Sequence, residues 1–294
     1  MKSSKQGLEI ILTHGKENST MSALTINKNK TVGNNIINTW WNGFLKTINP
    51  VNIMHDLTNF RVKEWIMLTL MLASQAVAFI FGADYSVMGW IGLITGVFTI
   101  LSLILCDRGR ITNYFFGFIG CAIWLVIAIH NRLIGDIFSQ SFYIFMNLFY
   151  GIYAWNRALL NDVNTNDDNN VGSNEIKPRK MTRTQAVIAF ILSIIAYFII
   201  VYISHKANGN LIWLDAALLP LGVCGQILMS LGYRSQWIAW IIVDIVNVII
   251  WSLRLADGGA AASSMLILQI AMLINAIYGC WLWFHTGTST ETIK

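Results

Sequence analysis

The sequence predicts an all-α polytopic membrane protein with eight transmembrane helices. Of its 294 residues, 55% are hydrophobic and only 12% are charged, whereas a soluble domain carries about 25% charged residues. The hydrophobic residues gather in eight runs, each close to the ~20 residues that a helix needs to cross a hydrocarbon core. Backbone groups find no water there, so each run is expected to be a helix. This composition excludes an ordinary soluble domain.

The expected elements follow one another without a large soluble domain. The first stretch, 1–35, is rich in Lys, Asn, Ser and Thr, which predicts disorder. Residues 36–63 mix Trp and aliphatic residues with Asn, Lys and Asp, which indicates an interfacial segment or a connector that touches the first span. A hydrophilic linker is expected at 157–183 and a short tail at 285–294. The expected spans are 64–82, 86–106, 111–130, 137–156, 184–204, 211–230, 236–253 and 262–284.

Lys and Arg are concentrated in one of the two sets of loops between these spans. The richer set contains Lys46, Arg61, Lys63, Arg108, Arg110, Arg157, Lys177, Arg179, Lys180, Arg183, Arg234 and Lys294. The opposite set contains Arg132, Lys206 and Arg254. The positive-inside rule places the richer set, and with it both termini, in the cytoplasm. The net charge of +5 therefore reflects membrane topology, and binding to nucleic acid is not indicated.

The two halves of the chain repeat each other. An offset of 123 residues aligns 113–114 with 236–237, and it lays the first expected span over the fifth. An offset of 128 aligns 147–155 with 275–283, where Asn, Tyr, Gly, an aromatic residue and Trp recur in the same order. Each repeat holds four spans, an even number, so the two copies run in the same direction. Transporters commonly place their substrate site between such repeats.

A polar stripe runs along the seventh expected span. Trp237, Trp240, Asp244, Asn247 and Trp251 are spaced by 3, 4, 3 and 4 residues, which places them on one helix face among Ile and Val. No Lys or Arg lies inside an expected span to pair with Asp244. Its carboxylate must therefore face a wet cavity, be protonated or meet a cation. Our hypothesis is that it faces a substrate cavity.

Similar polar faces on other spans supply further candidates for substrate contact. The full set is Trp237, Trp240, Asp244, Asn247, Gln269, Asn275, Tyr278, Asn113, Gln140, Asn147 and Tyr150. Each has an alternative role. Trp237, Trp155 and Trp283 are also typical of the aromatic belt at the membrane interface. The repeated Asn and Tyr residues could instead hold packed helices together. Asp215, near the outer end of the sixth span, is a weaker candidate that a helix N-terminus could satisfy.

Three motifs give the chain a specific resemblance. Asn113-Tyr-Phe-Phe-Gly117, Asn147-x-x-Tyr-Gly-x-Tyr-x-Trp155 and Trp237-x-x-Trp240 resemble the PnuC family of vitamin transporters. The resemblance covers roughly residues 50–284. It implies two three-helix bundles, at 86–156 and 211–284, joined by a linking helix at 184–204 in a SWEET-like 3+1+3 arrangement. It also implies a homotrimer, and it makes 64–82 an extra first helix.

The same resemblance implies a function in vitamin B3 uptake for NAD biosynthesis. Members import nicotinamide riboside across the bacterial inner membrane by facilitated diffusion and alternating access, and a cytoplasmic nicotinamide riboside kinase traps the cargo. Aromatic faces suit its cationic ring, and amides and hydroxyls suit its carboxamide and ribose. Many relatives carry Asn where this chain has Asp244. That departure either favours a cationic cargo or indicates a different vitamin or nucleoside.

Other functions remain open at this point. Thiamine, riboflavin or a deoxynucleoside would need similar stacking rings and amide partners. A membrane enzyme or a receptor is a more distant alternative. The sequence has no G-x-x-x-x-G-K-[ST] loop, no G-x-S-x-G motif and no paired His ligands, so catalysis, a metal or another cofactor is not expected. In the repeat alignment Cys121 faces Asp244 and Trp124 faces Asn247. The second bundle therefore carries the charge and is expected to make most substrate contacts.

Overall fold

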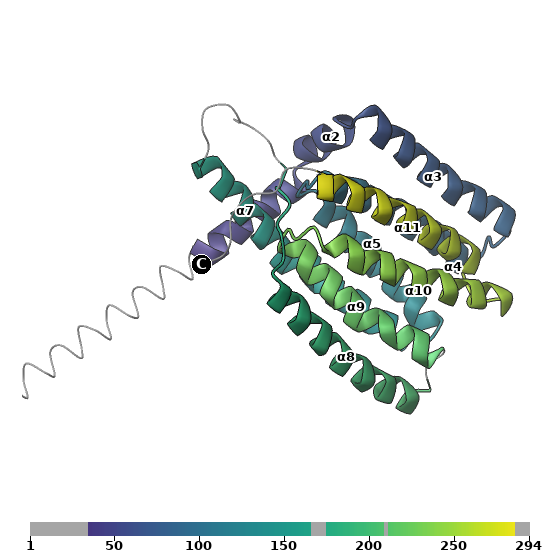
Figure 1. Cartoon of the computed structure of the whole chain (residues 1–294). Coiled ribbons are helices and arrows are strands. Elements are labelled where there is room, and N and C mark those ends of the chain that lie inside the picture. The colour runs from purple at the N-terminus through teal and green to yellow at the C-terminus, as the bar shows by residue number, and fades with distance from the viewer. Residues whose placement is uncertain (1–34, 166–174, 209–210, 286–294) are drawn as a thin grey trace, which may run out of the picture.

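The computed structural model describes residues 35–165, 175–208 and 211–285, and its regular elements are helices (Figure 1). Except at their boundaries, the predicted disorder at 1–35 and the tail at 285–294 lie outside the described residues. A helix at 35–48 comes first. The others are α2 (Pro50–Thr58), α3 (Val62–Gly82), α4 (Val87–Asp107), α5 (Asn113–His130), α6 (Ile134–Phe145), η1 (Met146–Tyr150), α7 (Gly151–Thr165), α8 (Arg183–Lys206), α9 (Ile212–Ser230), α10 (Gln236–Ala256) and α11 (Ala262–His285).

Seven of the described helices are long and apolar enough to cross a membrane, namely α3, α4, α5, α8, α9, α10 and α11. They confirm seven of the eight expected spans as apolar helices. The remaining one, expected at 137–156, is built from α6, the π-helical turn η1 and the start of α7 in unbroken succession. The extra residue that a π turn accommodates lies within the first copy of the repeated motif, at 146–150.

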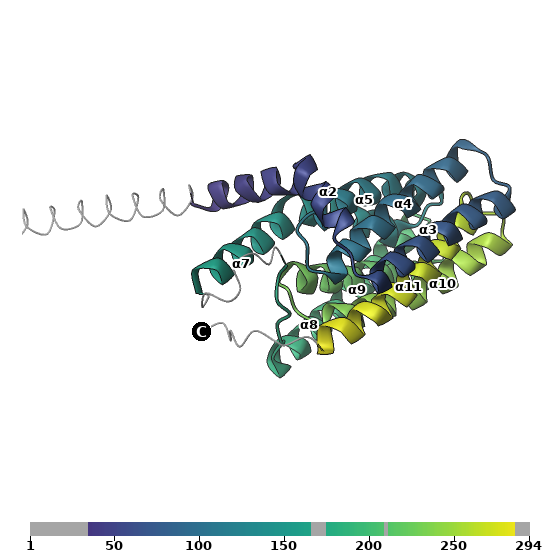
Figure 2. The same cartoon turned by 90° about the horizontal axis from the view of Figure 1, so that it is seen from above.

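Six helices form a closed ring in the order α4, α5, α6, α9, α10 and α11, with α11 returning to α4. The first three belong to one repeat and the last three to the other. The α3 helix packs on both α4 and α11, and α8 packs on both α9 and α6 (Figures 1 and 2). Both outer helices therefore cover a seam between the repeats. Because the 123-residue offset superimposes their sequences, α3 is the counterpart of α8.

The element boundaries follow the repeat. The offset of 123 carries Asn113, the first residue of α5, to Gln236, the first residue of α10, and the offset of 128 carries the start of α6 to the start of α11. The turns before α5 and α10 each need a glycine in the left-handed region, Gly109 (φ +68°) and Gly232 (φ +71°). The repeat detected in the sequence is therefore a repeat of structure.

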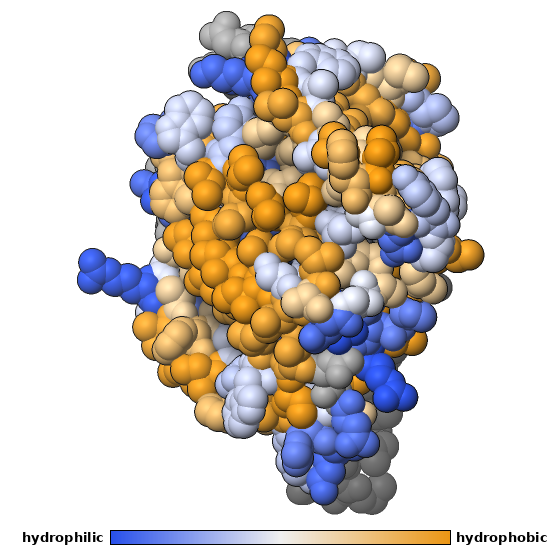
Figure 3. Space-filling model, turned by 90° about the vertical axis from the view of Figure 1, so that its right-hand side faces the viewer, coloured by the Kyte–Doolittle hydropathy of each residue, from blue (hydrophilic) through white to orange (hydrophobic). Residues whose placement is uncertain are grey.

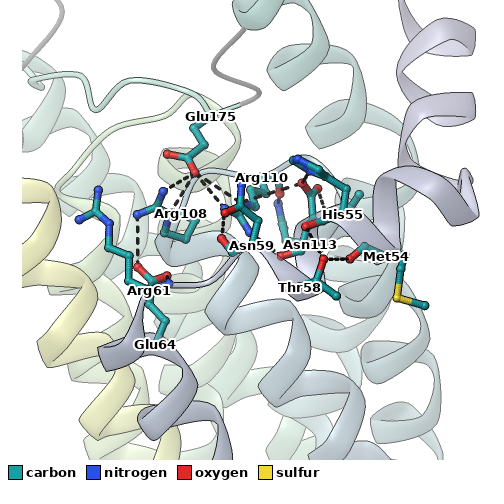
Figure 4. A network of polar contacts seen from close by, with 12 residues as sticks. Met54, His55, Thr58, Asn59, Arg61, Glu64, Arg108, Arg110, Asn113 and Glu175 are labelled. Atoms are coloured by element: carbon teal, nitrogen blue, oxygen red, sulfur yellow. Dashed lines mark hydrogen bonds and ion pairs between the residues drawn. The ribbon is translucent and has the colours of Figure 1, made fainter.

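The segment at 175–180 crosses both of these turns. Ile176 N donates to Gly109 O at 3.1 Å, and Arg179 N donates to Gly232 O at 2.8 Å. Glu175 adds ion pairs from its carboxylate to Arg108 (2.6 Å) and Arg110 (3.2 Å) (Figure 4). The end of the expected linker is thus a strap that joins the two repeats at the end of the bundle rich in Lys and Arg.

At the beginning of the expected linker, α7 continues as a helix to Thr165. The helix at 35–48 packs against η1 and α7, and it projects with α7 from the same end of the bundle (Figure 2). Trp40 Nε1 donates to Leu148 O at 3.0 Å, and Asn156 Nδ2 donates to Thr39 O at 2.8 Å. This packing supports α7 beyond the bundle. The expected segment at 36–63 comprises this helix, α2 and their connection to α3.

The outer surface suits a hydrocarbon environment. On the face in Figure 3, hydrophobic side chains form a broad continuous area with hydrophilic side chains toward its margins. The α8 helix is exposed along most of its length, with Val187 and Phe198 among its exposed apolar side chains. Exposed apolar side chains of this extent are typical of a lipid-facing helix.

Candidate substrate cavity

A cavity of about 110 Å³ lies inside the ring of six helices, and each of these helices contributes to its lining. Its walls combine aromatic rings, amides, hydroxyls and two carboxylates within an apolar frame. The residues that line it with a polar or aromatic side chain are Thr99, Ser102, Trp124, Asp136, Ser139, Gln140, Tyr143, Asn147, Gln226, Trp237, Trp240, Asp244 and Asn247. Both repeats therefore build the cavity.

Six of the eleven predicted contact residues meet at this cavity. They are Trp237, Trp240, Asp244, Asn247, Gln140 and Asn147. The first four come from the polar stripe of α10, and the exposed outer side of this helix carries Ile238, Ile242, Ile245 and Ile249. Trp237 is only 1% exposed, so its alternative interpretation as an interfacial belt residue is wrong.

Asp244 lies in the wall of this cavity and is 1% exposed. Among the described residues, no hydrogen-bond donor reaches its Oδ1, and Asn247 Oδ1, one helical turn away, is also without a partner. Buried polar atoms are almost always paired with protein or water. Two unpaired oxygens on one face of α10 are therefore available to water or to a ligand in the cavity.

Asp136 is a second carboxylate in the cavity, and the sequence prediction missed it. Its Oδ2 accepts from Trp124 Nε1 at 2.8 Å, and its Oδ1 accepts from Gln140 Nε2 at 2.9 Å. The span was expected to begin at 137, whereas α6 begins at Ile134, so Asp136 lies inside the helix. Its four-residue spacing from Gln140 is a signal that could have placed both on one face. The expectation that only the second bundle carries the charge is therefore wrong.

Asp215 caps the helix that carries Asp136. Its carboxylate accepts from Gly135 N at 2.5 Å and from Asp136 N at 3.1 Å. These are unpaired amides of the first turn of α6, which attract a negative charge. The expectation that a helix N-terminus satisfies Asp215 is confirmed, and that helix belongs to the other repeat.

Two rings from different repeats meet in the cavity wall. Tyr143 of α6 and Trp240 of α10 pack edge to face, with their ring centroids 5.7 Å apart. Gly225 makes room for Trp240, because a Cβ at this position would lie 3.1 Å from the indole ring. The aromatic wall is thus held by contacts between the repeats.

The other five predicted residues lie outside the cavity. Asn113 Nδ2 donates to Arg110 O at 2.6 Å at the start of α5, and Asn275 Nδ2 donates to Asp107 Oδ1 at 3.3 Å. Gln269 is fully buried in α11. Tyr150 is 38% exposed, and Tyr278 stacks on Trp281. Their contact with a substrate stays a prediction.

The repeated motifs join the two halves of the molecule. Trp155 Nε1, in the first repeat, donates to Met229 O at 3.0 Å, and Trp283 Nε1, in the second, donates to Asp107 O at 2.9 Å. Both indoles are at most 2% exposed, so their interpretation as belt residues is wrong. Asn147, which also lines the cavity, accepts through Oδ1 from Gln226 Nε2 at 2.9 Å. The structure therefore supports the helix-joining role for much of the motif.

A polar pair closes the opposite end of the ring. Arg254 Nη2 donates to Asn131 Oδ1 at 3.1 Å. The offset of 123 makes these two residues equivalent, and equivalent residues that touch must lie beside the axis that relates the repeats. The Asn131–Arg254 contact therefore lies near the centre of this end of the ring. The hydrogen bonds of Trp155 and Trp283 join the repeats near the other end.

Two parallel repeats of membrane-length helices around a central cavity with polar groups in its walls define the class of this protein, a membrane transporter. Comparison with known proteins then identifies its family. The family model for nicotinamide mononucleotide transporters matches residues 89–285. The chain therefore belongs to this family. The relatives that it matches are named PnuC. Its relatives are named as transporters, and the chain is not an enzyme.

The individual relatives are distant but cover most of the chain. The nicotinamide riboside transporter PnuC of Haemophilus influenzae is 25% identical over 75% of this chain and 88% of its own length. The protein of the same name from Neisseria mucosa is 24% identical over 75% of this chain and 80% of its own length. A crystal structure of the vitamin B3 transporter PnuC has a TM-score of 0.65 at 24% identity and covers 83% of this chain and 95% of that one. This likeness supports the shared fold.

Proposed function

We propose that this protein imports nicotinamide riboside by facilitated diffusion and binds it in the cavity between the two repeats. One observation carries the proposal. The cavity combines two carboxylates, Asp136 and Asp244, with aromatic rings and amides, while no Lys or Arg is among the described residues that line it. A buried site of this kind favours a flat cation that also forms hydrogen bonds. The names of the relatives, nicotinamide riboside transporters, support the same cargo.

Each part of this cargo has a partner in the cavity. The cationic pyridinium ring can stack on Trp240 or Trp237, with a cation–π attraction of about 0.5–2 kcal/mol when partly desolvated. Asp244, with its unpaired Oδ1, supplies the negative charge. Asn247, Gln140 and Asn147 can exchange hydrogen bonds with the carboxamide and the ribose hydroxyls. The side chains of Gln269, Asn275, Tyr278, Asn113 and Tyr150 lie outside the cavity, and for the buried Gln269, Asn275 and Asn113 we propose roles in supporting the helices.

Transport requires the ring to open. A cavity of about 110 Å³ is smaller than the ~300 Å³ at which pockets for small molecules usually begin, so the cargo must widen it on entry. The Asn131–Arg254 contact at one end and the Trp155 and Trp283 contacts at the other suit alternating access, in which the repeats rock about the central site. In this scheme one set of contacts breaks while the other holds.

The surrounding arrangement follows from the same proposal. The protein spans the bacterial inner membrane eight times with both termini in the cytoplasm, as two three-helix bundles joined by α8, with α3 as the added helix and residues 157–183 as the cytoplasmic linker. It assembles as a homotrimer. A carrier with no energy source only equilibrates its cargo, so a cytoplasmic nicotinamide riboside kinase would trap the vitamin for NAD biosynthesis.

Uptake into proteoliposomes tests the proposal. Radiolabelled nicotinamide riboside, thiamine, riboflavin and deoxynucleosides are each offered to liposomes with and without an enclosed kinase, and protein-free liposomes are the control. We expect nicotinamide riboside to equilibrate without the kinase and to accumulate as a phosphorylated product with it. Entry of none of these compounds would contradict the assignment as a transporter.

Thiamine is the second candidate cargo. The observation that favours it is Asp244, because a thiazolium cation needs a carboxylate and an aromatic face as much as a pyridinium does. Selective entry of thiamine in the same experiment would replace the proposed cargo and leave the cavity assignment intact.

A further inference from the structure

A second hollow, of about 400 Å³, lies at the end of the bundle where the strap crosses the two turns. Its walls come from η1 and α7 on one side, from residues 176–179 of the strap on another, and from the turn before α10. The side chains that matter here are Tyr150, Tyr153, Arg157, Lys177 and Arg179. None of them lines the central cavity.

The charge of this hollow is of one sign. Among the described residues, the charged ones that line it are Arg157, Lys177 and Arg179, and no described carboxylate pairs with any of them. The described acid in the strap, Glu175, is already bound by Arg108 and Arg110 (Figure 4). Three cations that line one hollow and have no counterion among the described residues repel each other, so an anion bound there would stabilise the strap.

The two arginine side chains each make contacts within the protein that orient their guanidinium groups. Arg179 Nη1 donates to Leu231 O at 3.4 Å, and its guanidinium lies over Tyr233 at 5.5 Å from the ring centroid. Its Nε is buried and has no hydrogen-bond acceptor among the described residues. Across the hollow, Arg157 Nη1 donates to Tyr153 Oη at 3.0 Å. A buried donor of a charged group that has no acceptor destabilises the folded protein, and an acceptor on a bound ligand would remove this cost.

We propose that this hollow binds a phosphate group. Arginine presents a planar set of donors that matches phosphate oxygens, and lysine adds a point charge. The volume falls in the range of small-molecule pockets, and Tyr150 and Tyr153 provide aromatic faces beside the cations. The phosphate is carried by a soluble nucleotide or by the headgroup of an acidic phospholipid, which present the same chemistry. The proposal does not depend on the cargo of the central cavity.

Binding to the full-length protein in phosphatidylcholine nanodiscs tests the soluble source. The probes are inorganic phosphate and the matched pair nicotinamide mononucleotide and nicotinamide riboside, which differ by one phosphate. Thermal unfolding and equilibrium binding are measured for the wild type, Lys177→Gln and Arg157→Gln. Lys180→Gln is the control, because it removes the same charge from an exposed position of the same strap outside the hollow. Native mass spectrometry of protein with phosphatidylglycerol or phosphatidylcholine tests the lipid source.

We expect saturable binding of the phosphate-bearing probe that weakens about 10-fold in Lys177→Gln and in Arg157→Gln, as expected for the loss of one charged hydrogen bond, and is unchanged in Lys180→Gln. If only phosphatidylglycerol retention follows this pattern, the phosphate belongs to a lipid. The proposal is wrong if Lys177→Gln and Arg157→Gln bind the soluble probes and retain phosphatidylglycerol as Lys180→Gln does, while all three variants unfold at the wild-type temperature. Loss of cargo uptake alone would bear on the central cavity and not on this site.

Discussion

The two repeats share their frame but differ in the surface they turn toward the cavity. In the first repeat Gly151 packs against the ring of Tyr114, and in the second Gly279 packs against Trp237. The same offsets relate both the glycines and the rings. Trp155 and Trp283 then donate to the opposite repeat in reciprocal fashion. The frame therefore recurs in both repeats, although the backbone carbonyls that accept from the two tryptophans, Met229 O and Asp107 O, are one residue out of register under the offset of 123.

The residues that line the cavity differ between the two repeats. Cys121 stands opposite Asp244 in the repeat alignment, and Asp136 of α6 aligns with Ser264 of α11. Each repeat supplies one carboxylate, from a different helix and in a different state. Asp136 is held by Trp124 and Gln140, whereas Asp244 Oδ1 has no partner in the described part of the chain. The two repeats thus share the packing of their frame and differ in the residues that line the cavity.

The largest effect should come from the unpaired carboxylate. Asp244→Asn replaces the carboxyl group whose Oδ1 has no partner among the described residues, and we expect uptake of nicotinamide riboside to fall about 10-fold or more, since a hydrogen bond to a charged group contributes about 1.5–3 kcal/mol. Asp136→Asn should cost less, because that carboxylate is occupied by two side chains. Initial uptake rates in proteoliposomes measure both. Asp257→Asn, at an exposed site outside the cavity, is the control, and equal losses in Asp136→Asn and Asp244→Asn would remove the distinction.

The frame should respond equally in both repeats when its glycines are filled. A Cβ on Gly279 would lie 2.7 Å from Asp107 Oδ1 and from Trp237, and one on Gly151 would meet the Tyr114 ring. Overpacking of this kind costs about 1–3 kcal/mol, so Gly151→Ala and Gly279→Ala should both lower the unfolding temperature. Gly258→Asn is the control, because a Cβ there has open space and Asn tolerates a positive φ. Tolerance at only one of the two motif glycines would show that the frames are not equivalent.

Loss of the reciprocal hydrogen bonds should have a smaller effect. Trp155→Phe and Trp283→Phe each remove one donor to the opposite repeat, at about 1 kcal/mol. Thermal unfolding in detergent measures the change. Trp281→Phe, at a half-exposed position within the second copy of the motif, should leave stability nearly unchanged. A large loss for Trp155→Phe with none for Trp283→Phe would contradict the reciprocal arrangement.

The smallest effect concerns a contact between loops of the two repeats. Asp84 accepts from Ser86 Oγ at 2.5 Å and from Ala261 N at 3.2 Å, and the bond from Ser86 is the main cause that holds its pKa below the usual 3.8. A carboxyl with a lowered pKa adds stability above its unfolded pKa and loses it as the pH falls through the folded value. Wild-type protein should therefore lose more stability than Asp84→Asn as the pH falls below about 4. Parallel pH profiles of thermal unfolding would contradict this contribution.

The sequence predicted the helices better than it predicted the contacts between them. The span expected at 184–204 is the helix Arg183–Lys206, because long apolar runs leave little choice of structure in a membrane. The π turn at 146–150 could not be read from residue types, since its extra residue is accommodated by tertiary packing. Trp155 and Trp283 look like belt residues in sequence, because a buried indole and an interfacial indole occupy the same place at a helix end.

The residues of the cavity could be predicted only in part, because the sequence shows polar residues within a span but not the helix packing that decides where they point. The stripe on α10 was recognisable because Asp244 and Asn247 are conspicuous among Ile and Val. Gln269 is equally conspicuous in α11, yet it is buried outside the cavity, and only the packing of α11 in the ring decides this. Asp136 was missed because the apolar run begins after it. Polarity within a span therefore predicts burial among helices more reliably than it predicts the helix face that meets a ligand.

An experimental structure with nicotinamide riboside bound would test the central claim most directly. The account predicts the pyridinium ring inside the ring of six helices, beside Trp240, with the Asp244 carboxylate within hydrogen-bond or ion-pair distance and with contacts from both repeats. Cargo bound outside this cavity, or held by the second repeat alone, would contradict it.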